Sequence, residues 1–89
     1  MFSKYKSIEL RCTYVLKLED DCWYVGCTNY LNNRLKQHWS SNGSEWTKLH
    51  KPIAVAAIYQ GDYEWGATKY AIAKYGTKKV RGYGWTKSK

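Results

Sequence analysis

Four side chains in the first half of the sequence have types and spacing that suit chemistry on a charged substrate. Tyr14 and Tyr24 lie ten positions apart, and Arg34 and His38 lie four apart. An arginine guanidinium is always charged and offers a planar fork of donors that suits phosphate oxygens. A histidine titrates near neutral pH and can pass a proton. Taken singly, each residue has an ordinary explanation as a sheet tyrosine, a solvated arginine or a rim histidine. Only their joint spacing favours a site.

Two strands are predicted to position the tyrosines. Residues 12–18 alternate and are rich in β-branched and aromatic side chains, and residues 22–27 have the same character. The acidic segment between them reads as a short turn, so the two strands form a hairpin. The register that this turn favours has Leu16 opposite Tyr24 and Tyr14 opposite Gly26. Both tyrosines then emerge on one face, although a slip of one residue would separate them.

A helix over residues 30–39 is predicted to carry the arginine and the histidine. Thr28 or Asn29 can cap its start, because either side chain accepts a hydrogen bond from the first free amides. Its predicted buried stripe, with four-residue spacing, is Leu31, Leu35 and Trp39. A second stripe beside it holds Tyr30, Arg34 and His38.

The second half of the chain predicts one more strand and one more helix. Residues 53–59 are apolar on both faces, which favours a central strand, and a helix begins at residue 64 or 65 and runs to Tyr75. Gly76 is suited to end that helix. Residues 46–52 read as an irregular basic and aromatic segment. The predicted architecture is α/β of the α+β type: a small three-stranded antiparallel sheet with flanking helices, in the order β-β-α-β-α.

Length and charge limit what this architecture does. Eighty-nine residues allow one domain, predicted over residues 12–76, with a basic leader at 1–11 and a basic extension or linker at 77–89. Fifteen basic against seven acidic residues give a net charge of +8, and residues 66–89 hold seven basic residues and no acid. Such a stretch favours nucleic acid over a merely solubilising face.

The cysteines and the hydropathy pattern indicate the compartment. Three cysteines leave one unpaired in any disulfide scheme, which favours reduced thiols, and their spacing argues against a zinc site. Neither a membrane span nor a signal peptide is apparent. We therefore expect an intracellular protein with no membrane association.

The motifs resemble the GIY-YIG nuclease domain. In that family a Gly-Ile-Tyr triplet precedes a Tyr-Ile-Gly triplet by about ten residues, and an arginine follows the second glycine by eight. The second triplet here is Tyr24-Val25-Gly26, which differs only by Val for Ile, and Arg34 has the expected spacing. The first triplet, Cys12-Thr13-Tyr14, departs at two of three positions. Residues 46–52 also resemble the loop before the family's third strand, and the match covers roughly residues 12–76.

The resemblance implies hydrolysis of a phosphodiester bond in DNA, which is duplex or branched. It implies that Tyr14 or Tyr24 is the base for an attacking water, that Arg34 holds the phosphate, and that His38 relays a proton or binds the phosphate. A divalent cation, Mg²⁺ or Mn²⁺, would be held by one carboxylate with waters. Predicted nucleic-acid contacts are Gly26, Lys36, Trp46, Lys48 and His50. Relatives commonly carry an appended DNA-recognition domain.

One position departs from the family pattern in this alignment. The metal-binding glutamate of the second helix falls on Ala71, which cannot ligate a metal, and Glu64 lies seven residues earlier. The alignment therefore predicts a chain that binds metal weakly or not at all and cleaves poorly. Such an alanine marks either a deliberate Glu→Ala substitution, which the retention of the other catalytic types favours, or a natural relative that no longer cleaves.

Two other functions compete with the nuclease. One is a non-catalytic nucleic-acid-binding module that uses the same basic face. The other is a small interaction domain whose charge is incidental. Binding to phosphates weakens steeply as salt rises. A salt titration therefore separates the interaction domain from the nuclease and from the nucleic-acid-binding module.

Overall fold

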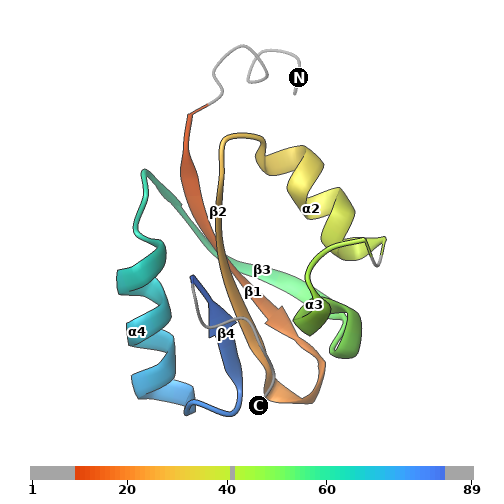
Figure 1. Cartoon of the computed structure of the whole chain (residues 1–89), viewed down its shortest axis with the longest axis vertical. Coiled ribbons are helices and arrows are strands. Elements are labelled where there is room, and N and C mark those ends of the chain that lie inside the picture. Colours follow the sequence, from red (N-terminus) through yellow and green to blue (C-terminus); the bar gives the residue numbers. More distant parts are fainter. Residues whose placement is uncertain (1–9, 41, 84–89) are drawn as a thin grey trace.

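The computed structural model describes residues 10–40 and 42–83 and has a mixed four-stranded sheet at its centre (Figure 1). The strand order is β3-β1-β2-β4. The strands are β1 (Cys12–Leu18), β2 (Trp23–Thr28), β3 (Pro52–Gln60) and β4 (Val80–Gly82). A 3₁₀ turn, η1 (Glu19–Asp21), joins β1 to β2, and the helices are α2 (Leu31–Trp39), α3 (Glu45–Leu49) and α4 (Glu64–Tyr75).

The predicted hairpin and its register are confirmed. β1 and β2 pair antiparallel with Leu16 opposite Tyr24 and Tyr14 opposite Gly26. Asp20 and Asp21 in the turn have φ of 63° and 57°, a left-handed conformation that aspartate tolerates better than most residues. Both tyrosines consequently project from the same face of the sheet, and their ring centroids are 6.3 Å apart.

The prediction of three antiparallel strands is wrong, because β4 adds a fourth strand parallel to β2. Val80 pairs with Trp23, and Gly82 pairs with Val25. β4 lies in the segment that the sequence assigned to an extension without regular structure, and three residues are too few to show a periodic pattern. A Cβ at Gly82 would lie 2.7 Å from the Val25 carbonyl oxygen and 2.8 Å from the Thr68 hydroxyl. Glycine is therefore what lets β4 approach so closely.

The prediction that β3 is central is also wrong, because β3 forms one edge of the sheet. It pairs only with β1 among the described strands, and two register shifts interrupt that pairing. Most of its residues are exposed, including Ile53 and Ile58. The apolar character of β3 therefore reflects a face that the rest of the described chain does not cover.

Helices cover both faces of the sheet (Figure 1). On one face α2 and α3 enclose a core that contains Tyr14, Tyr24 and Trp46. On the other face α4 packs over β2 and β4, and its Ala71 is buried with Val25 and Val80. The tyrosines and α4 thus lie on opposite faces of the sheet.

The helices differ from the prediction in three details. α2 begins at Leu31 without a side-chain cap, and Thr28 instead accepts a hydrogen bond from the Tyr30 amide. Trp39, predicted in the buried stripe, is 46% exposed, whereas His38 is 1% exposed. The segment predicted as irregular forms α3, which Ser44 caps by accepting from the Thr47 amide.

α4 ends as predicted at Gly76, whose φ is 97°. No helix within residues 10–40 and 42–83 is both long enough and apolar enough to cross a membrane.

Candidate active site

The centre of the site is a hydrogen bond between Tyr14 on β1 and His38 on α2. The Tyr14 hydroxyl lies 2.8 Å from His38 Nε2, and each side chain is 1% exposed. The predicted juxtaposition of tyrosine and histidine is therefore present, although His38 lies in the core rather than at a rim. Gly26 is directly across the sheet from Tyr14, and a Cβ on it would collide with the Tyr14 hydroxyl.

Thr47 on α3 determines which nitrogen of His38 carries the proton. The Thr47 hydroxyl donates to the Ser44 carbonyl at 3.0 Å, so it can only accept from His38 Nδ1, which lies 3.1 Å away. His38 therefore carries its proton on Nδ1, and the lone pair of Nε2 accepts from the Tyr14 hydroxyl. The sequence analysis missed Thr47, whose only signal is its place three residues after a helix-capping serine.

Burial keeps both members of this pair uncharged. Loss of solvation raises the pKa of Tyr14 above its ordinary value, the charges of Tyr24 and Glu64 raise it further, and Arg34 acts in the opposite direction. Loss of solvation, followed by the Arg34 charge, lowers the pKa of His38 to about 4. At neutral pH the pair is thus a phenol that donates to a neutral imidazole.

Arg34 joins the second tyrosine to this pair. Partial burial opposes its charge, but hydrogen bonds and charge interactions with Tyr14 and Tyr24 outweigh that effect and raise its pKa. Its Nη1 also donates to Gln37 Oε1 at 2.7 Å, a partner that the sequence analysis did not identify. The four predicted catalytic residues, Tyr14, Tyr24, Arg34 and His38, therefore form one cluster with a fixed positive charge.

Two carboxylates, Asp62 and Glu64, lie at the start of α4 and just before it. Glu64 is half-buried, and one of its oxygens accepts from the Tyr83 amide at 2.9 Å. One donor atom from each of Cys27, Asp62 and Glu64 lies within 4.8 Å of the others. The Glu64 amide, and to a lesser extent Arg11, lowers the pKa of Asp62. The charge of Glu64 makes the smallest contribution to the raised pKa of Tyr14.

Ala71, the position that the alignment matches to the family's metal-binding glutamate, lies in the core, and its assignment stays a prediction. Ala71 is 3% exposed and packs against Val25 and Val80, on the face of the sheet opposite the tyrosines. A longer side chain at this position would enter the apolar core. Glu64, seven residues before Ala71, lies instead beside Cys27 and Asp62.

The predicted nucleic-acid contacts fall into two groups. Lys36 and Lys48 are exposed and stay predictions. Trp46 is instead a core residue: it is 5% exposed, and its indole N–H donates to the Trp23 carbonyl at 3.0 Å. His50 is bound to Asp20 at 3.0 Å and packs against the Trp46 ring. Gly26 acts through the space it leaves for Tyr14.

The fold and the tyrosine cluster define a small α+β catalytic domain, and its family follows from comparison. The family model described as the GIY-YIG catalytic domain matches residues 10–81. The chain therefore belongs to the GIY-YIG family, which is a family of nucleases. Nucleases of this family commonly use divalent metal ions.

Among curated proteins the chain is similar to several UPF0213 proteins of Bacillus. It is 33% identical to the UPF0213 protein YazA of Bacillus subtilis over 72 residues, which are 79% of this chain and 73% of the relative. It is 34% identical to a UPF0213 protein of Bacillus cereus over 47 residues, or 53% of this chain and 49% of that relative. No solved structure matches the chain.

Proposed function

We propose that this protein is a metal-dependent DNA endonuclease that hydrolyses phosphodiester bonds at the tyrosine cluster. The observation that carries the proposal is the hydrogen bond from Tyr14 to a neutral His38, beside the charged Arg34. Hydrolysis of a phosphodiester needs a proton acceptor for water and positive charge near the phosphate oxygens, and this cluster supplies both.

The proton path follows from the tautomer of His38. The attacking water gives its proton to the Tyr14 oxygen while the hydroxyl proton of Tyr14 moves to His38 Nε2, so no free phenolate forms. This matters because burial raises the pKa of Tyr14 and makes a phenolate costly. Oxygen from water bonds to phosphorus, and the bond to the leaving oxygen breaks. Arg34 donates to the phosphate oxygens, where charge accumulates.

The donors at the start of α4 fit the divalent metal ion that the family commonly uses. Glu64 would hold the ion, with Asp62 adding negative charge and waters completing the shell, because Mg²⁺ prefers oxygen ligands and few protein carboxylates. Burial raises the pKa of Cys27, so its thiol stays protonated at neutral pH and does not compete as a ligand. When bound, such an ion supplies positive charge at the leaving oxygen.

The reason to expect an inactive chain rested on Ala71, which lies away from the cluster. With Glu64 as the metal ligand, the chain as written carries a complete set of groups. We therefore propose that it is active in the presence of Mg²⁺ or Mn²⁺.

The test is nicking of supercoiled plasmid and branched DNA with Mg²⁺. The unchanged chain should cut, and Glu64→Gln and Arg34→Ala should each lower the rate by at least about a hundredfold. Glu64→Gln keeps an oxygen that can accept from the Tyr83 amide, so the fold should persist. Glu45→Gln, on the exposed start of α3, is the matched control and should cut like the unchanged chain.

Binding without cutting in any metal would sink the nuclease proposal. The chain would then be a nucleic-acid-binding module on the same fold.

A further inference from the structure

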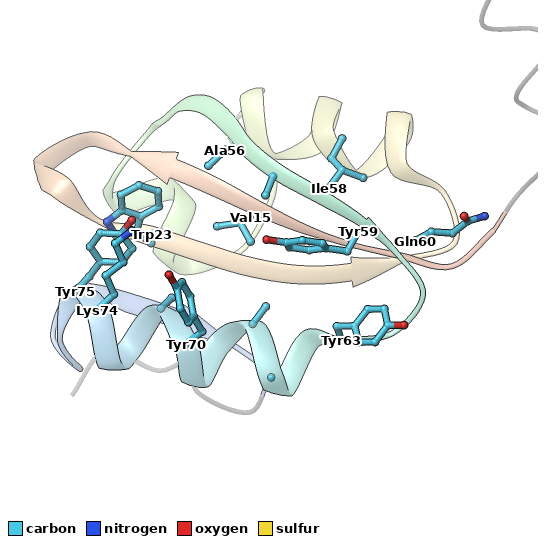
Figure 2. A pocket seen from close by; sticks show the side chains of 14 residues that line it. Val15, Trp23, Ala56, Ile58, Tyr59, Gln60, Tyr63, Tyr70, Lys74 and Tyr75 are labelled. Carbon is cyan, nitrogen blue, oxygen red and sulfur yellow. The ribbon is translucent and has the colours of Figure 1, made fainter.

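A groove of about 890 Å³ lies between β3 and α4, on the face of the sheet opposite the tyrosine cluster (Figure 2). It exists because α4 packs over β2 and β4 and leaves the β3 side of that face uncovered. Small side chains on both elements keep it open, among them Ala57 on β3 and Gly66 and Ala67 on α4. The mechanism proposed above uses none of these residues.

The groove is lined by five aromatic rings, which are Trp23, Tyr59, Tyr63, Tyr70 and Tyr75. Those of Tyr59, Tyr63 and Tyr70 are 49%, 60% and 67% exposed. At the opposite end from Tyr63 (Figure 2), Trp23 and Tyr75 stack with centroids 4.2 Å apart and planes at 12°. Tyr59, Tyr63 and Tyr70 therefore leave ring surface open to solvent along the groove.

The charges at the groove are positive. None of the described residues that line it is acidic, and the one charged lining residue is Lys74, whose Nζ lies 5.9 Å from the Tyr70 centroid and 5.4 Å from that of Tyr75. Lys17 extends over Trp23 at 5.7 Å. Ring faces with adjacent ammonium groups are the combination on which bases stack while their phosphates meet cations.

We propose that this groove binds an unpaired segment of a nucleic-acid strand, whose bases stack on Tyr59, Tyr63 and Tyr70. α4 has twelve residues and is about 18 Å long, which is the length of roughly five stacked nucleotides at about 3.4 Å each. Tyr63 at one end of the groove directly precedes Glu64. A strand leaving the groove there would arrive beside the proposed metal ligand. This inference rests on the proposed function, since it assigns a second contact to the same nucleic acid.

The net charge of the protein argues against a second copy of the chain as the molecule that binds in this groove. The outer edge of β3 bears no strand among the described residues and could in principle pair with another β3. Such pairing would bring together two molecules that each carry a net charge of +8, which is unfavourable at low and moderate salt. A polyanion gains from the same charge.

The test is binding of a fluorescent oligothymidylate of about 12 nucleotides, measured by anisotropy in EDTA so that nothing is cut. Tyr70→Ala should weaken binding roughly tenfold. Tyr59→Ala should do the same, and it provides a second variant in case Tyr70→Ala disturbs folding. Tyr70→Phe keeps the ring and should bind like the unchanged chain. Trp39→Ala removes an exposed ring outside the groove and should have no effect.

Two results would overturn the groove assignment. One is unchanged oligothymidylate binding in correctly folded Tyr70→Ala and Tyr59→Ala. The other is a dimer in sedimentation experiments that these substitutions abolish while binding persists, which would make the groove an interface between copies.

The assays separate this inference from the proposed nuclease. If Glu64→Gln abolishes cutting and the groove variants bind normally, only the groove assignment fails. If the unchanged chain never cuts but its oligothymidylate binding depends on Tyr70, the groove stands and the nuclease fails.

Discussion

At the scale of single residues, the tyrosine–histidine pair is uncharged at rest. Tyr14 and His38 are both enclosed, so ionising either one costs solvation that the surrounding protein does not replace. In the proposed step Tyr14 ends uncharged and His38 ends as an imidazolium, so the reaction carries the solvation cost of that one charge. The same enclosure makes the pair sensitive to acid.

We expect His38 to lower the stability of the protein in acid. Its pKa falls from 6.5 to about 4 on folding, so between these values the unfolded chain binds the proton more readily. Stability is then complete above about pH 6.5, and about 3 kcal/mol is lost as pH falls to 4. Urea unfolding across this range would measure the loss.

His38→Gln is the control for this prediction, because glutamine does not titrate. Its unfolding free energy should be lower at neutral pH but nearly flat between pH 6.5 and 4. A slope equal to that of the unchanged chain would assign the effect to another group. The lowered pKa of Asp62 acts below its ordinary value of 3.8 and so falls outside this window.

The absence of a side chain at Gly26 leaves room for the Tyr14 hydroxyl, and adding a single methyl group tests this. In Gly26→Ala the new Cβ collides with the Tyr14 hydroxyl, so the ring must move away from His38. We expect cleavage to fall at least about a hundredfold, and overpacking to cost about 1–3 kcal/mol of stability. Plasmid nicking and urea unfolding measure the two effects. Full activity in this variant would contradict the place given to Tyr14.

The residues proposed as catalytic could be identified from the sequence, but their partners could not. The resemblance to the family's motifs singled out Tyr14, Tyr24, Arg34 and His38, and periodicity placed them on a hairpin and a helix, which are local structures. Thr47 acts on His38 from a different helix, and nothing in the order of residues brings α3 to α2. Burial of His38 rather than Trp39 also depends on how α2 meets the sheet.

At the scale of elements, local pairings were predictable and distant ones were not. The β1–β2 register follows from a three-residue turn. β4 returns to β2 from the far end of the described chain, and its three residues carry too little pattern to identify. The edge position of β3 was missed because an apolar strand normally indicates cover on both faces.

The two candidate metal positions, Glu64 and Ala71, both lie on α4, and a substitution at Ala71 distinguishes between them. Ala71→Glu places a carboxylate against Val25 and Val80 in the core, where an unpaired charge is strongly disfavoured. We expect it to lower the unfolding free energy by more than about 3 kcal/mol and not to increase cleavage. Increased cutting by Ala71→Glu would instead support the alignment that matches Ala71 to the family's metal-binding glutamate.

At the scale of the whole molecule, the net charge of +8 would govern encounter with the DNA proposed as the substrate. Its distribution is less simple than the sequence indicates. Arg81, one of the basic residues near the C-terminus, is 4% exposed and lies 4.4 Å above the Trp46 ring. Lys79 donates to the Asp20 carbonyl. Part of the basic sequence thus supports the fold, so composition alone overstates the surface that meets phosphate.

Salt dependence of binding measures how many basic residues contact phosphates. Affinity for DNA should fall steeply with salt, and Lys36→Gln and Lys48→Gln should each lower the slope of log affinity against log salt by about one. Both lysines are exposed on the helices that cover the tyrosine cluster. Anisotropy at several salt concentrations gives the slopes. Unchanged slopes in both variants would place the phosphates elsewhere.

The parallel pairing of β4 has a consequence for the order of folding. The β1–β2 hairpin closes a very short loop, whereas β4 must find β2 across most of the chain, and distant contacts form slowly because closing long loops costs entropy. The amide of Tyr83, just after β4, holds the Glu64 carboxylate. We therefore expect the proposed metal site to be completed by a late step. Molecules caught earlier, with their lysines already displayed, would hold nucleic acid without damaging it.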